Sequence, residues 1–144
     1  MTKNITMKNY EVEPLKQFLA EIPLKGASSR MRTRFINILN DQINLISEER
    51  NVLVEDYAKK DDEGNSVTET TEDGRLFVII EDKEQYNKEI LKLMHEDFIY
   101  GVSPEKEQMI SSVYDALINY DRELTGEEAF IYDRFCEIFE VLDV

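Results

Sequence analysis

The feature that most constrains the fold of this 144-residue sequence is a long run of apolar residues at helical spacing between residues 27 and 57. One stripe of this run passes through Ile36, Leu39 and Ile43, and a second stripe beside it begins at Phe35. Two adjacent stripes form a face that is broader than the single seam of a two-stranded coiled coil. The sequence therefore predicts a long amphipathic helix that packs against at least two other helices.

A β-hairpin and a returning helix are predicted after the long helix. Charged and turn-forming residues end the long helix, and the dipeptide Asp73-Gly74 favours a two-residue turn before a β-branched and aromatic strand at 76–80. Asp82 and Gln85 are spaced as a capping pair that opens the returning helix. This stretch is therefore predicted to form an antiparallel helical hairpin with a β-hairpin at its tip.

The apolar side chains of the predicted β-hairpin need cover, because an isolated two-stranded hairpin is marginal in water. Its two faces carry Phe77 with Ile79, and Leu76 with Val78 and Ile80. If the helices of the chain do not cover such a face, a protein partner does. Phe77 and Ile79 are therefore candidate protein-binding residues.

Short elements are predicted on the N-terminal side of the long helix. Period-two alternation at residues 5–8 indicates a strand, and residues 98–100 have the β propensity to pair with it. Apolar residues at helical spacing from Glu13 indicate a helix of about two to three turns, which Pro23 ends. These elements are expected to pack on the helical hairpin.

Two further helices are predicted at the C-terminal end. Ser103, Pro104 and Glu105 start the first of them, and Thr125 with Glu128 is spaced as a capping box for the second. No repeat or flexible linker divides the chain, so residues 1–144 are predicted to form a single domain. The predicted fold class is mainly α (α+β), an antiparallel helical hairpin with a β-hairpin at its tip, packed with two C-terminal helices and a short N-terminal strand and helix.

The chain is strongly acidic, with 31 Asp and Glu residues against 17 Lys and Arg residues and a formal net charge of −14. Such a chain repels nucleic acid phosphates and anionic lipids, so neither direct nucleic acid binding nor a membrane partner is expected. No signal-peptide-like segment and no run of about 18 apolar residues occurs. The single cysteine, Cys136, cannot form an internal disulfide, which favours a reducing compartment.

The basic residues gather near the N-terminus. Residues 3–34 carry seven basic and three acidic side chains, a net charge of +4, which leaves −18 for the rest of the chain. Arg30 and Arg34 are four residues apart and share a face of the predicted helix, whereas Arg32 points elsewhere. These two arginines either lie on a solvated face or form a patch that binds the carboxylates or phosphates of a partner.

No catalytic or cofactor-binding signature is present. One histidine, His95, and one cysteine cannot form the clusters that structural zinc requires, and no nucleotide-binding, nucleophile-elbow or metalloprotease motif occurs. A calcium loop is the alternative, because acidic and amide side chains fall at four EF-hand positions: Asp61, Glu63, Asn65 and Glu72. However, Ser66 stands where that loop needs glycine. We therefore predict a protein that is not an enzyme and that holds no cofactor or metal.

Three stretches of the chain resemble a known family: MKNYEVEPLKQFLAEIPLKGASSRMRTRFINIL, VLVEDYAKKDDEGN and LTGEEAFIYDRFCEIFE. They are similar to a family of small uncharacterised proteins encoded by tailed phages and prophages of Gram-positive bacteria. The likeness rests on the Lys25-Gly26 turn with the arginines that follow it, the helix exit between Glu55 and Gly64, and the Thr125 capping box. The resemblance implies a phage origin and a location in the host cytoplasm or the virion, and it transfers no activity to individual residues.

Two functions are considered from these observations. The first is a non-enzymatic phage protein-binding module with an assembly or minor structural role, which contacts a phage or host protein through Phe77, Ile79, Arg30 and Arg34. The second is an acidic decoy that inhibits a host nucleic-acid-binding enzyme, motivated by the charge of −18 after residue 34. A homo-oligomer is also open, because a second copy could cover the broad face of the long helix.

Overall fold

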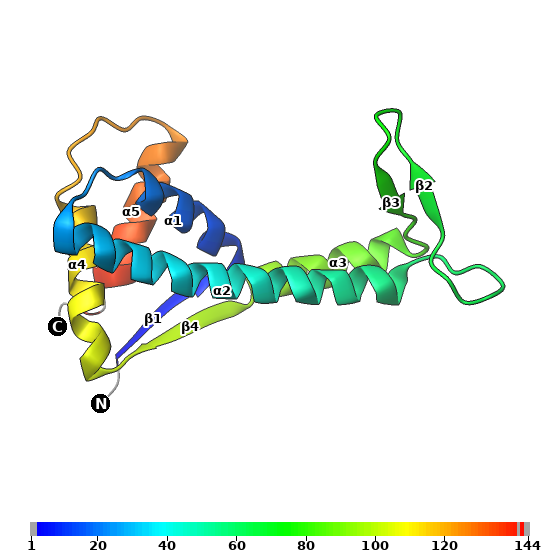
Figure 1. Cartoon of the computed structure of the whole chain (residues 1–144), viewed down its shortest axis with the longest axis horizontal. Helices are drawn as coiled ribbons and strands as arrows, with labels where there is room; N and C mark the ends of the chain where they lie inside the picture. Colours follow the sequence, from blue (N-terminus) through cyan, green and yellow to red (C-terminus); the bar gives the residue numbers. More distant parts are fainter. Residues whose placement is uncertain (1–2, 141, 143–144) are drawn as a thin grey trace. The chain divides into compact units, whose positions relative to one another are not determined.

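The protein has the predicted mainly α fold, with two short antiparallel pairs of strands (Figure 1). The computed structural model describes residues 3–140 and residue 142. The elements in chain order are β1 (Lys3–Lys8), α1 (Asn9–Glu21), α2 (Gly26–Tyr57), β2 (Thr68–Thr70), β3 (Leu76–Val78), α3 (Lys83–His95), β4 (Asp97–Val102), the 3-10 helix η1 (Pro104–Lys106), α4 (Glu107–Ile118) and α5 (Glu127–Glu140). They divide into two compact units. Unit 1 comprises the residues up to Ile43 and those from Asp97 onward, and unit 2 comprises Asn44–Glu96, so that α2 contributes to both.

β1 and β4 pair in unit 1, as predicted. The pair is antiparallel, with Ile5 opposite Tyr100 and Met7 opposite Phe98. Ile5 and Met7 are buried, and Thr6 between them is exposed, so one face of the pair is turned to the core. The two ends of unit 1 are thereby joined, although all of unit 2 lies between them in the sequence.

α1 begins at Asn9, four residues before the predicted start. Glu11 closes its first turn by accepting the backbone N–H of Lys8 at 2.9 Å. Asn9 is buried, and its side-chain oxygen accepts a hydrogen bond from Gln42 of α2 at 2.9 Å. These bonds fix the helix start early, so Pro14 lies inside α1 and not in its first turn.

The core of unit 1 forms where α1, the first part of α2, α4 and α5 meet the buried face of the β1–β4 pair. Phe18 of α1 packs edge-on against Phe135 of α5 with ring centroids 5.6 Å apart. Phe35 of α2 does the same with Phe139 of α5 at 5.7 Å. Because Gln42 of α2 also bonds Asn9 of α1, the long helix contacts both α1 and α5, which confirms the inference from its broad apolar face. The fully buried side chains are Ile5, Met7, Val12, Leu15, Leu19, Phe35, Leu39, Val113, Leu117, Phe135 and Phe139.

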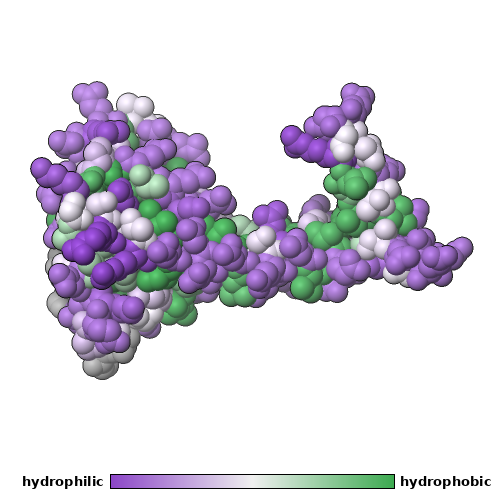
Figure 2. All heavy atoms as spheres, in the orientation of Figure 1, coloured by the Kyte–Doolittle hydropathy of each residue, from purple (hydrophilic) through white to green (hydrophobic). Residues whose placement is uncertain are grey.

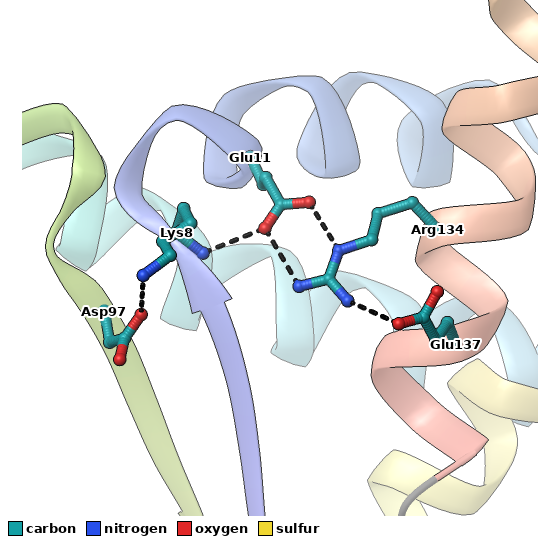
Figure 3. Close-up of polar contacts among 5 residues, drawn as sticks. All are labelled: Lys8, Glu11, Asp97, Arg134 and Glu137. Atoms are coloured by element: carbon teal, nitrogen blue, oxygen red, sulfur yellow. Dashed lines mark hydrogen bonds and ion pairs between the residues drawn. The ribbon is translucent and has the colours of Figure 1, made fainter.

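A network of ion pairs joins β1, α1, β4 and α5 (Figure 3). Arg134 donates from Nε to Oε2 of Glu11 at 2.7 Å, from Nη2 to Oε1 of Glu11 at 3.2 Å, and from Nη1 to Glu137 at 3.2 Å. Lys8 pairs with Asp97 at 2.7 Å. Burial alone raises the pKa of Glu11, but the hydrogen bonds from Arg134 and from the Lys8 backbone outweigh it, and the pKa lies below its ordinary value.

The two C-terminal helices form, with small differences in where they start. The predicted Ser103-Pro104-Glu105 start opens the 3-10 turn η1, and α4 follows it. α5 begins at Glu127, two residues after the predicted cap Thr125. Gly126 precedes it with a φ of 58°, a left-handed conformation that glycine adopts readily, and its carbonyl accepts the N–H of Ala129 at 3.2 Å.

Unit 2 contains the predicted helical hairpin, made of the last part of α2 and of α3. Asp82 caps α3 by accepting the N–H of Gln85 at 3.1 Å, as predicted. Tyr86 of α3 lies edge-on to Tyr57 of α2 with ring centroids 6.4 Å apart, so α3 starts beside the end of α2 and runs antiparallel to it (Figure 1). The β2–β3 hairpin lies between the two helices in the sequence.

Candidate protein-binding surface

The tip of unit 2, residues 58–80, is held by a backbone junction of three chain segments. Lys59 donates its N–H to the carbonyl of Ile79 at 2.8 Å, Ile79 donates to Val67 at 2.9 Å, and Val67 donates to Lys59 at 2.8 Å. The three bonds close a ring. Two loops leave this junction, the short loop at residues 60–66 and the β2–β3 hairpin at residues 68–78 (Figure 1).

The turn of the β2–β3 hairpin differs from the predicted one. Thr71 donates its N–H to the carbonyl of Arg75 at 2.7 Å, and its hydroxyl oxygen accepts the N–H of Arg75 at 3.0 Å. Gly74 donates to the carbonyl of Thr71 at 3.0 Å and has a φ of 88°. Among the described residues only glycines have positive φ, so Asp73 does not adopt the conformation that a two-residue type I′ turn needs. The turn therefore has three residues, Glu72 to Gly74.

The short loop repeats this pattern, and Asp61, the first residue of the calcium alternative, uses a side-chain oxygen to bind the loop backbone. Asp61 donates its N–H to the carbonyl of Asn65 at 2.9 Å. The Asp61 carboxylate accepts the N–H groups of Glu63 at 2.9 Å and Asn65 at 3.0 Å. In the described part of the chain, no group of three or more His, Cys, Asp or Glu side chains is arranged to hold a metal ion.

The β2–β3 hairpin exposes large apolar side chains. Leu76 is 73% exposed and Phe77 is 44% exposed, and both strands are uncovered along most of their length. Phe77 lies opposite the exposed Glu69. Figure 2 shows hydrophobic side chains on the visible face of the hairpin and hydrophilic ones at its turn. Ile79, the other predicted contact residue, is half-buried where its backbone joins the junction.

Unit 2 has little core of its own to cover these side chains. Its buried apolar residues are Ile46, Ala58 and Leu93, whereas the largest fully buried side chains among the described residues all belong to unit 1. Its two helices expose three more apolar side chains, namely Leu45 at 45%, Val52 at 59% and Leu91 at 58%. Unit 2 therefore leaves five large apolar side chains in water, and two of them, Leu76 and Phe77, lie on the hairpin.

The tip is also acidic. Its residues 58–80 carry six carboxylates and three basic side chains, a net charge of −3. Hydrogen bonds from Lys60 and Ser66 lower the pKa of Glu55, and a hydrogen bond from the Thr71 hydroxyl lowers the pKa of Asp73. These carboxylates are therefore ionised at neutral pH.

The predicted arginine pair lies in unit 1. Arg30 and Arg34 are exposed one turn apart on α2, and Arg34 donates to the sulfur of Met31 at 3.9 Å. Arg32 points away from them, as predicted, and donates to the carbonyl of Leu19 at 2.9 Å and to that of Ile22. Arg32 therefore caps the C-terminal end of α1, which is a structural role that the sequence alone did not reveal.

The remaining reactive side chains have structural surroundings. His95 lies in the last turn of α3, where its Nδ1 is 2.8 Å from the carbonyl oxygen of Leu91. Burial raises the pKa of the Cys136 thiol, which keeps it in the neutral, weakly nucleophilic form.

Among the described residues, no helix combines the length and apolar composition that crossing a bilayer requires.

Two features of the surface were missed by the sequence analysis. Leu76 is the most exposed apolar residue of the hairpin, yet alternation along the strand did not distinguish it from Val78 and Ile80. Phe130 on α5 is 79% exposed although it lies within an apolar helical pattern, and no local signal separates it from its buried neighbours.

Compared with protein-family models, curated proteins and solved structures, the chain gives no match.

Proposed function

We propose that this protein is a non-enzymatic binding module that grips a protein partner with the β2–β3 hairpin of unit 2. The observation that carries the proposal is the exposure of Leu76 and Phe77 on a two-stranded hairpin without cover from its own unit. Each large apolar side chain that moves from water into an interface contributes about 1.5–3 kcal/mol. Leu76 and Phe77 follow one another in β3 and therefore project from opposite faces of the hairpin, so a partner that covers both has to contact both faces of the hairpin.

The charge of the tip indicates the chemistry of the partner. The tip that carries Leu76 and Phe77 holds six carboxylates and three basic side chains. Like charges facing each other across an interface are unfavourable, so the matching surface has an apolar centre and a basic rim. Binding is therefore expected to weaken as salt concentration rises, since exposed charges are screened.

A double variant tests this proposal directly. Leu76→Ser with Phe77→Ser should lower affinity for the partner at least about tenfold, while the helical circular dichroism signal stays unchanged because both side chains are exposed. Leu91→Ser is the matched control, because Leu91 is 58% exposed in the same unit but lies on α3. Each protein would be used as bait in lysate from phage-infected cells, and equal capture by the double variant and the control would exclude the hairpin.

We further propose, on the resemblance described above, that the partner is a phage or host protein and that the role lies in particle assembly or in a minor structural position. The expected locations are the host cytoplasm and the virion. Quantitative mass spectrometry of purified particles tests the structural role. A protein that stays in the lysate and never co-purifies with particles is an accessory factor and not a structural part.

The acidic decoy is the second candidate, and the charge of the tip is the observation that favours it. A decoy occupies the site of nucleic acid, so its capture of a host enzyme should be lost when double-stranded DNA is added in excess. Binding through Leu76 and Phe77 predicts the opposite outcome, capture that resists DNA but is lost in the double variant. The two candidates are therefore separated in one competition experiment.

A further inference from the structure

The β3 side of the hairpin has an open edge of backbone groups. Thr71 donates its N–H to Arg75 at 2.7 Å, and Ile79 donates its N–H to the residue before β2 at 2.9 Å. In an antiparallel pair, residues that bond the opposite strand alternate with residues that do not. The register therefore leaves Leu76 and Val78 unbonded to β2, with their N–H and C=O groups turned to the other side of the strand.

The open edge continues past the end of β3. Lys59 donates its N–H to the carbonyl of Ile79 at 2.8 Å, and Glu81 donates its N–H to the last residue of α2 at 2.9 Å. Ile79 and Glu81 are thus turned to the junction, and the backbone groups of Ile80 between them are turned the other way. Every second residue from 76 to 80 therefore presents its N–H and C=O groups on one edge. No other segment of the described chain bonds these groups.

The side chains along this edge do not protect it from other strands. Residues 76–80 are Leu, Phe, Val, Ile and Ile, without a charge or a proline. On the opposite edge, β2 has the sequence Thr-Glu-Thr and carries a charged side chain. Charges and prolines are the usual means by which proteins keep a free strand edge from pairing with another chain. The β3 edge lacks both and is therefore the one suited to pair with a further strand.

We propose that an extended segment of the protein partner adds to this edge as a third strand beside β3. The inference rests on the proposed function and specifies how the partner is held. Main-chain hydrogen bonds hold such an added strand, and its side chains continue both faces of the sheet. One segment therefore lies beside Leu76 on one face and beside Phe77 on the other, although these two side chains project in opposite directions.

The charges at the two ends of the edge indicate a different protein and not a second copy. Residues 72–75 carry two carboxylates and one arginine, a net charge of −1, and residues 81–84 carry three carboxylates and one lysine, a net charge of −2. Two-fold antiparallel pairing of this edge with itself would place these two net negative ends side by side. Like charges across an interface are unfavourable. The added strand is therefore apolar in its centre and basic at its ends.

Amide exchange measured by NMR on the full chain tests the proposal. The probe is the synthetic peptide Lys-Lys-Val-Thr-Val-Thr-Val-Lys-Lys, which supplies an extended segment with basic ends. At about 1 mM peptide, exchange at the amides of Leu76, Val78 and Ile80 should slow at least about fivefold, which corresponds to a dissociation constant of about 0.25 mM or lower. The amides of Thr68 and Thr70 on the opposite edge should not change. The same peptide with glutamate in place of lysine should bind at least about fivefold more weakly.

Proline variants on the two edges provide a matched control. Thr68 and Val78 lie directly opposite each other in a pair that is not hydrogen-bonded, so proline at either position removes an outward N–H without removing a bond of the hairpin. Val78→Pro should raise the dissociation constant of the peptide at least about fivefold, and Thr68→Pro should leave it unchanged. Val78→Ala keeps the N–H and should change it less than about twofold.

Protection of the Arg75 amide, which is bonded inside the hairpin, shows whether each variant keeps the hairpin. If a proline variant loses this protection, the wild-type exchange pattern decides alone. The proposal is overturned if the peptide at about 1 mM slows no amide of the edge, or slows those of Thr68 and Thr70 instead. It is also overturned if the edge amides slow without peptide as the protein concentration rises, because a second copy then covers the edge. A glutamate-flanked peptide that binds equally well would overturn the basic ends assigned to the partner.

Capture from the lysate separates this inference from the proposed function. If Val78→Pro captures the same proteins as wild type while the Leu76→Ser, Phe77→Ser double variant loses them, the hairpin binds through its side chains and the strand addition is wrong. If the double variant also keeps them, the proposed function itself is wrong.

Discussion

Replacing Glu11 by Gln should destabilise unit 1 by removing the charge that holds α5 against β1 and α1. The Glu11 side chain is 8% exposed and receives two hydrogen bonds from Arg134, at 2.7 and 3.2 Å. It also accepts the N–H of Lys8 at 2.9 Å. Glutamine keeps the shape and one acceptor oxygen, but its amide N–H₂ group then faces the guanidinium, which only donates.

The expected loss is about 2 kcal/mol in the free energy of unfolding. A hydrogen bond that involves a charged group contributes about 1.5–3 kcal/mol, and breaking a fully buried ion pair costs about 3–5 kcal/mol. The value expected for Glu11→Gln lies in the range for a charged hydrogen bond, because the Arg134 side chain is 39% exposed and keeps its bond to Glu137. Solvent and the remaining carboxylate therefore take over part of the lost interaction.

Urea unfolding followed by far-UV circular dichroism measures this effect. Glu137→Gln is the control, because Glu137 also pairs with Arg134 at 3.2 Å but is 63% exposed, so it should cost less than about 1 kcal/mol. A Glu11→Gln protein whose stability equals that of the control would refute the argument that burial makes this pair important.

The same pair gives a pH dependence of known sign. The pKa of Glu11 is lower in the folded protein than its ordinary value, because the hydrogen bonds of the carboxylate outweigh the effect of burial. A lowered pKa contributes stability that is present above the unfolded value of about 4.3 and is lost as the pH falls through the folded value. The stability difference between wild type and Glu11→Gln should therefore be constant near neutral pH and shrink in acid. A difference that grows in acid would contradict this assignment.

Two further variants test local features. Arg32→Gln should lower the free energy of unfolding by about 1–2 kcal/mol, because it leaves the carbonyls at the end of α1 without their donor. The control is Arg34→Gln, at an exposed position, which should change the free energy of unfolding by less than about 0.5 kcal/mol in the same urea assay. Gly74→Ala should destabilise the hairpin turn by about 1 kcal/mol, because a residue with a Cβ is strained at the φ of 88° found there. No atom lies close enough to clash with the new Cβ, so backbone strain is the whole cost. Hydrogen exchange at the Arg75 amide should then be about fivefold faster, with no change in the helices. Unchanged exchange would show that the turn does not depend on the left-handed glycine.

The elements that could be predicted are those encoded by neighbouring residues. The long helix, the capping of α3 by Asp82 and the presence of a hairpin around Gly74 all follow from spacing and turn chemistry within a few residues. Pairing of β1 with β4 was also predicted, from the alternation at residues 5–8 and the β propensity of residues 98–100. The predictions that were wrong include the start of α1, where Asn9 is fixed by Gln42 from another helix, and the hairpin turn, which has three residues in place of two.

The candidate surface could be predicted only in part. Alternation along residues 76–80 indicated that apolar side chains need cover, and the structure decides that Leu76 and Phe77 are the exposed ones while Ile79 is held at the junction. Exposure depends on which segments pack nearby, and the spacing of a single strand does not contain that information. The apolar hollow between α1 and α5, beside Phe130, likewise depends on tertiary packing, because residues of both helices line it.

The sequence by itself determined where helices and strands form, because periodicity and capping act over one or two turns of chain. Tertiary structure decided what those elements do. Glu11 and Arg134 are 123 residues apart, and only packing brings them together and buries the Glu11 carboxylate against an arginine that stays 39% exposed. In the same way, α2 has one continuous pattern of apolar residues, yet its two parts have different surroundings. Its first part lies in the well-filled core of unit 1, and its last part lies in unit 2, which has three buried apolar residues. The physical reason is that burial and charge pairing depend on distant neighbours, which local spacing does not specify.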